Sequence, residues 1–102
     1  MKVLFVCSQG MSSAIAVNAL KKEAEKNGVN MEVNAVSTQE FEEEVKEGYD
    51  VAMVAPQVRH RFDYLKEYAD AAKVPCALIQ PQAYSTLGGP KLFKQVKELV
   101  EA

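Results

Sequence analysis

KVLFVCSQGMSS, residues 2–13, is the stretch that decides the fold, because an apolar run ends there on a cysteine and a small polar loop follows. A near-continuous apolar run over Lys2–Val6 is typical of a parallel strand that is covered on both faces. A helical pattern begins directly after the loop. A strand, a thiol, a loop rich in backbone N–H groups and a helix N-terminus together form an anion site with a nucleophile at its edge. The stretch therefore predicts that Cys7 holds or transfers a phosphoryl group.

Strand and helix patterns alternate from this stretch to the end of the chain. Apolar runs predict strands over residues 2–6, 30–36, 50–55 and 76–79. Apolar spacing and capping signals, including a capping box at residues 37–40, predict helices over residues 12–26, 37–48, 58–72 and 90–100. Residues 80–89 show no regular pattern.

This alternation predicts the class of fold. Four strands that alternate with helices imply a parallel sheet with right-handed crossovers. We expect an α/β fold, a four-stranded parallel sheet flanked by helices on both faces, in a flavodoxin-like three-layer sandwich. A flavodoxin-like sheet of this size has the strand order 2-1-3-4. The loops after Val6 and after Ala55 then share the carboxyl edge of the sheet, where open α/β sheets bind their ligands.

Composition restricts the possible partners. At 102 residues, with 48% hydrophobic and 25% charged side chains, we expect one globular domain over residues 1–102. The formal net charge of −2 argues against a nucleic-acid partner. No apolar stretch is long enough for a secretion signal or a membrane span, so we expect a cytoplasmic protein without direct membrane insertion. Two cysteines and one histidine are too few ligands for a zinc site, and we expect no metal and no cofactor.

The residues of the loop separate it from other phosphate-binding loops. A thiol reacts as its thiolate, which a helix N-terminus stabilises, and Gly10 lets the backbone turn closely. A cysteine phosphatase carries Cys-x5-Arg, and here the arginine position is Ser13. A nucleotide P-loop needs Gly-Lys-Ser/Thr, whereas Gly10 is followed by Met11. Without a cationic side chain in the loop a phosphocysteine would persist, as a carrier requires.

A structural cysteine is the simpler interpretation of each thiol. Cys7 would then be a buried residue at a strand end, since free cysteines are often core residues. The motif and its context favour the functional interpretation for Cys7. Cys76 follows Pro75 at the start of an apolar strand, at the opposite edge of the sheet, and we expect it in the core.

The loop and the end of the third strand resemble a known family. Residues 3–13 are similar to the active loop of the enzyme IIB component of the lactose/cellobiose (chitobiose) class of bacterial sugar phosphotransferase systems. Residues 53–57, MVAPQ, resemble that family's usual Leu-Gly-Pro-Gln ending, and the length and the element order also fit. In this chain Gln9 stands where relatives often have alanine, and Ala55 replaces the glycine before Pro56.

The resemblance implies a phosphocarrier with two protein partners. Cys7 would accept a phosphoryl group from a phosphohistidine on the IIA protein. It would pass that group to a sugar, such as the β-linked disaccharides cellobiose, chitobiose or lactose, taken up through the membrane permease IIC. The protein would then lie at the inner face of the membrane through IIC. The residues that would bind the phosphate are Ser8, Gln9, Gly10, Met11, Ser12 and Ser13.

Five further residues near the expected site have a functional and a structural interpretation. Gln57 could help to hold the phosphate loop. Arg59 and Arg61 could contact an acidic partner or the incoming phosphate, or simply be solvated. Tyr84 could contact a partner or simply pack. His60 could be a base for Cys7, but a thiolate needs none, so we expect a solvent-facing residue.

Two other classes of protein stay open. A low-molecular-weight cysteine phosphatase or an arsenate reductase also places a thiol after the first strand, although Ser13 argues against this class. Hydrolysis of an aryl phosphate would favour it. A non-catalytic oxyanion-binding regulatory domain would have an unreactive Cys7, and slow alkylation of that thiol would favour this class.

Overall fold

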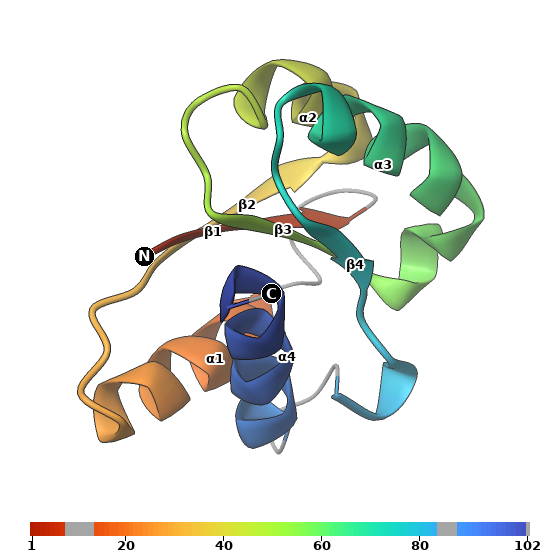
Figure 1. The fold of residues 1–102 in the computed structure, drawn as a ribbon. Coiled ribbons are helices and arrows are strands. Elements are labelled where there is room, and N and C mark those ends of the chain that lie inside the picture. Colours follow the sequence, from red (N-terminus) through yellow and green to blue (C-terminus); the bar gives the residue numbers. More distant parts are fainter. Residues whose placement is uncertain (8–13, 84–87, 102) are drawn as a thin grey trace.

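The computed structural model describes residues 1–7, 14–83 and 88–101, and these form a four-stranded sheet with helices around it. The strands are β1 (Lys2–Cys7), β2 (Glu32–Ser37), β3 (Val51–Val54) and β4 (Cys76–Leu78). All neighbouring strands pair in parallel, in the order β2-β1-β3-β4 (Figure 1). The predicted fold class and strand order are therefore confirmed.

Helices cover both faces of this sheet. The α-helices are α1 (Ala14–Lys26), α2 (Thr38–Glu44), α3 (Phe62–Ala71) and α4 (Gly89–Glu101), and two short 3₁₀ helices are η1 (Pro56–Arg61) and η2 (Pro81–Ala83). In Figure 1, α1 and α4 lie on one side of the sheet and α2 and α3 on the other. Within the described part of the chain, each helix is too short or too polar to span a bilayer.

Alternate side chains of the central strands build two apolar layers. Val3 and Phe5 of β1 pack against α1 and α4, whereas Leu4 and Val6 pack against α2 and α3. All residues of β1 after Lys2 are fully buried, and so are those of β3, because both faces of the sheet are covered. The helical residues of the two layers include Ala16, Leu20, Leu92 and Val96 on one side, and Phe41, Val45, Leu65 and Ala69 on the other.

The third α-helix begins later than the apolar spacing predicts. Val58, expected in a helix over residues 58–72, lies in η1 with φ −115° and ψ 24°, outside helical geometry. Pro56 has no N–H group to donate, and Ala55 before it is extended. The chain therefore turns in a 3₁₀ segment before α3 begins at Phe62, with the Val58 N–H donating to the Ala55 carbonyl at 3.1 Å.

β2 is an edge strand, and Val33 is its one buried residue. Ala35, which lies two residues further along the strand and so on the same face as Val33, is exposed. The strand ends at Ser37, which is also the N-cap residue of α2. Glu40 Oε1 accepts hydrogen bonds from the Ser37 backbone N–H at 3.3 Å and from the Ser37 hydroxyl at 3.0 Å. The capping box predicted at residues 37–40 is thereby confirmed.

Two glycines hold the start of α4 against its neighbours. A Cβ atom on Gly88 would lie 1.8 Å from the carbonyl oxygen of Ala83, and one on Gly89 would lie 2.6 Å from the carbonyl oxygen of Ala19 in α1. Both neighbours are backbone atoms, which cannot rotate away as a side chain can. Glycine is therefore required at both positions for α4 to approach η2 and α1 this closely.

Candidate functional site

The carboxyl edge of the sheet brings together the ends of β1, β2 and β3. Cys7 is the last residue of β1 and pairs with Ser37, the last residue of β2. On the other side, the Ala55 N–H donates to the Val6 carbonyl at 2.9 Å, and η1 follows directly. Figure 1 shows the end of β1 and the light green η1 segment on the same side of the molecule. The ends of β1 and β3, which the two predicted loops follow, are therefore neighbours.

The Cys7 side chain is buried at this edge, with 0% of its surface exposed. It belongs to the apolar layer on the side of α2 and α3, together with Phe41, Ala55 and Val58. The sequence predicts a thiol at the rim of a loop, whereas the structure places the sulfur in the interior. The physical reason is that α2 and η1 both contact β1, so its covered layer continues to its last residue. A reaction of Cys7 with a protein partner therefore requires a conformation in which the sulfur is accessible.

The other predicted site residues divide into two groups. Gln57 and Arg59 lie exposed on η1, next to this edge, and so do His60 and Arg61. The predicted phosphate-binding residues 8–13 and Tyr84 lie outside the described residues.

Sequence reasoning missed two residues that the fold places beside Cys7. Ser37 is its strand partner, but in the sequence Ser37 signals only the start of a helix. Val58 is 3% exposed and lies in the same apolar layer as Cys7, but its spacing to later apolar residues indicated a helix face. Ser37 could be found only from the strand register, and Val58 only from the position of η1 in the fold.

Cys76, the second thiol, lies at the opposite edge of the sheet. It is the first residue of β4, is half-buried, and pairs with Ala52 of β3. Burial raises the pKa of the Cys76 thiol to about 11; the nearby Lys66 lowers it and Asp70 raises it further. At neutral pH this thiol is therefore protonated and a poor nucleophile.

The raised pKa of Cys76 has a measurable consequence. In a Cys7→Ala variant, where Cys76 is the remaining thiol, the rate of alkylation by iodoacetamide should rise with pH to a midpoint near 11, because only the thiolate reacts. The same variant in denaturant serves as the control, with a midpoint near the ordinary thiol value of 9. A midpoint near 9 in the folded protein as well would contradict this expectation.

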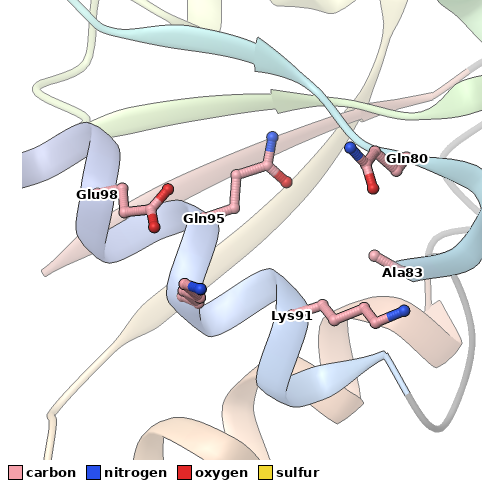
Figure 2. A pocket seen from close by; sticks show the side chains of 6 residues that line it. Gln80, Ala83, Lys91, Gln95 and Glu98 are labelled. Carbon is pink, nitrogen blue, oxygen red and sulfur yellow. The ribbon is translucent and has the colours of Figure 1, made fainter.

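A hollow between η2 and α4 is lined by residues other than Cys7, Gln57 and Arg59. Its volume is about 370 Å³, and Figure 2 shows that Gln80 lines it from the sheet side while Lys91 and Gln95 line it from α4. Gln95 donates an Nε2–H to the Leu78 carbonyl at 3.1 Å, which covers part of the open edge of β4. The described residues of the lining carry amide, ammonium and carboxylate groups, and none of them carries a thiol or an imidazole.

The fold and the carboxyl edge of the sheet define an α/β protein with a cysteine at a candidate anion site. An open parallel α/β sheet carries a cysteine at the end of its first strand, seven positions before α1 begins at Ala14. This is the edge at which such sheets bind their ligands, and helix N-termini there favour anions. In residues 1–7, 14–83 and 88–101, histidine, cysteine and acidic side chains form no group of three that could hold a metal ion.

The chain belongs to the family of lactose/cellobiose-specific IIB subunits of the bacterial sugar phosphotransferase system, or PTS. The sequence profile described as "PTS system, Lactose/Cellobiose specific IIB subunit" matches residues 2–95. The resemblance seen in residues 3–13 and 53–57 is therefore confirmed. The protein is an EIIB phosphocarrier, a component of a phosphotransferase enzyme for sugars of the lactose/cellobiose class.

Relatives match nearly the whole chain. An oligo-β-mannoside-specific EIIB component from Bacillus subtilis is 28% identical over 97% of this chain and 95% of its own length. Galactose-specific and cellobiose-specific EIIB components from Lactococcus lactis are each 28% identical over 96% of this chain and 94% of theirs. The sugars in these names differ, so these relatives indicate a sugar class and not one sugar.

Solved structures share the fold. A cellobiose-specific IIB component from Borrelia burgdorferi has a TM-score of 0.78 and 28% identity, over 99% of this chain and 92% of that one. The lactose-specific IIB domain from Streptococcus pneumoniae has a TM-score of 0.81 over 97% and 96% of the two chains, and at 24% identity it shows the fold alone. Membership of the family implies partners of the IIA and IIC types.

Proposed function

We propose that Cys7 carries the phosphoryl group, which it takes from a phosphohistidine of the IIA protein and delivers to a sugar at the IIC permease. The observation that supports this is the placement of the two thiols. Cys7 ends β1 at the carboxyl edge of the sheet, whereas Cys76 begins β4 at the amino edge and has a raised pKa. In the same proposal, Ser8, Gln9, Gly10, Met11, Ser12 and Ser13 bind the phosphate.

Both transfer steps take place at one sulfur atom. In the first step the Cys7 thiolate, whose proton has passed to water, attacks phosphorus in line. The S–P bond forms as the P–N bond of the donor phosphohistidine breaks, and the electron pair stays on the imidazole nitrogen. In the second step a sugar hydroxyl attacks the phosphorus, the S–P bond breaks, and the thiolate is regenerated. The hydroxyl proton passes to a base or to water at the acceptor.

Burial of Cys7 decides which experiment is informative. Because this sulfur has no exposed surface, alkylation would be slow in a carrier and equally slow in a non-catalytic oxyanion-binding domain. The alkylation rate therefore does not discriminate between the two. Uptake of a phosphoryl group does, because only the carrier forms a covalent S–P bond.

The cellular place of the protein follows from its partners. We propose that residues 1–102 act as a single IIB domain in the cytoplasm, meeting a IIA protein there and the IIC permease at the inner face of the membrane. The sugar that it serves belongs to the class of cellobiose, chitobiose and lactose.

The test of the proposal is the site of phosphoryl uptake. The chain is incubated with a IIA protein of this class that is phosphorylated on its histidine, and peptides are analysed by mass spectrometry. We expect one phosphoryl group per chain, on the peptide that contains Cys7. No uptake, or label on another residue, would reject the proposal. Hydrolysis of an aryl phosphate by the chain alone would favour the cysteine phosphatase or arsenate reductase alternative instead.

A further inference from the structure

Three consecutive basic residues stand beside the end of β1. Arg59, His60 and Arg61, called here the basic segment, are all exposed on η1. Their position is fixed from within, because Val58 is buried in the same apolar layer as Cys7. The Ala55 N–H bond to β1 joins the start of η1 to the strand that ends in the candidate nucleophile.

Within the described part of the chain, neither Arg59 nor Arg61 forms an ion pair with a carboxylate within 4 Å. Lys66 and Asp70 on α3 form an ion pair with an N–O distance of 3.1 Å, and neither arginine takes part in it. The Arg61 guanidinium instead lies 4.8 Å from the centre of the Tyr64 ring, and Tyr64 is itself 42% exposed. A face with positive charge and an aromatic ring is therefore open to a partner, on a chain whose net charge is −2.

We propose that the basic segment is the docking site for the acidic, phosphoryl-bearing surface of the phosphodonor protein. This inference rests on the proposed function of Cys7, and it identifies the phosphodonor as the protein that binds at η1. A donor that carries phosphohistidine brings negative charge to the encounter, and complementary charge at the rim of an interface speeds association.

The charge of the basic segment favours the donor over the permease. Cytoplasmic loops of membrane proteins carry an excess of lysine and arginine, so the inner face of a IIC permease would repel this segment. A positive rim beside Cys7 therefore suits the first transfer step, in which the partner carries a negatively charged phosphoryl group. It gives no corresponding advantage in the second step.

The test compares charge removal at the basic segment with an equal removal elsewhere. The second-order rate of phosphoryl transfer from a histidine-phosphorylated IIA protein is measured for the full chain, for Arg59→Gln/Arg61→Gln, and for Lys91→Gln/Lys94→Gln on α4 as the matched control. At low salt we expect the arginine variant to be slower by about tenfold, through a raised KM with kcat and final stoichiometry unchanged, and the lysine variant to stay within about twofold. Added salt should remove most of the difference.

A conservative variant separates charge from stacking. Arg59→Lys/Arg61→Lys keeps the charge, and we expect it to restore the rate to within about twofold of the unaltered chain. Equal rates for the arginine and lysine-control variants would overturn the inference while Cys7 still became labelled, so the proposed function would stand. The inference would also be overturned if the arginine variant accepted the phosphoryl group at an unchanged rate but transferred it more slowly to sugar at a IIC-containing membrane. Failure of the unaltered chain to become labelled would reject the proposed function itself.

Discussion

Replacing Cys7 by serine should abolish phosphoryl uptake from a phosphorylated IIA protein, whereas replacing Cys76 by serine should leave uptake largely intact. A serine hydroxyl does not ionise at neutral pH, and no base has been identified that would activate it. Cys76 is remote from the edge at which β1 ends, and its raised pKa keeps it protonated. Mass spectrometry of the two variants after incubation with the donor measures the expected difference directly.

The control for this experiment is the folded state of each variant. Cys7 lies in an apolar layer, where burying a hydroxyl is costly unless it is hydrogen-bonded, so Cys7→Ala is made beside Cys7→Ser. Both variants should keep the circular dichroism of the unaltered chain and lose the label. The proposal is wrong if a folded Cys7→Ser or Cys7→Ala chain keeps the label. It is also wrong if the Cys76→Ser chain loses the label.

Replacing Gly88 by alanine should destabilise the fold by about 3 kcal/mol or more. The new Cβ atom would lie 1.8 Å from the Ala83 carbonyl oxygen, so the backbone of η2 or of α4 must move. The Gly88 carbonyl also accepts the Leu92 N–H at 2.9 Å in the first turn of α4, and Leu92 is fully buried. Movement at Gly88 is therefore transmitted to the core. Urea unfolding followed by circular dichroism gives the free energy of unfolding.

Gly28 offers a matched control for this substitution. It has φ +69° after α1, and a Cβ atom there would meet nothing within 4 Å. Gly28→Asn should change the free energy of unfolding by no more than about 1 kcal/mol, because asparagine tolerates the left-handed conformation. If the Gly88→Ala and Gly28→Asn variants unfold at the same urea concentration, the close backbone approach at Gly88 does not affect the free energy of unfolding. The expectation is then wrong.

Local patterns predicted the elements that are long and periodic. The apolar run of β1, the capping box before α2 and the stripe of α4 each carry their own signal, and the structure has an element at each place. The segment from residue 56 to residue 61 is the exception. Its apolar spacing continues that of α3, but Pro56 and the extended Ala55 impose a 3₁₀ turn instead.

The candidate site was predictable only in part, because its residues meet through the sheet. Cys7 was identifiable from the loop that follows it in the sequence. Its neighbours Ser37 and Val58 come from two other segments, and only the register of parallel strands and the position of η1 bring them beside it.

The order of strand, thiol, polar loop and helix was legible in the sequence, because these features depend on neighbouring residues and their spacing. The burial of the Cys7 sulfur and the exposure of the basic segment were decided by the tertiary structure. Whether a side chain at a strand end is covered depends on elements distant in sequence, here α2 and η1, which pack over the end of β1.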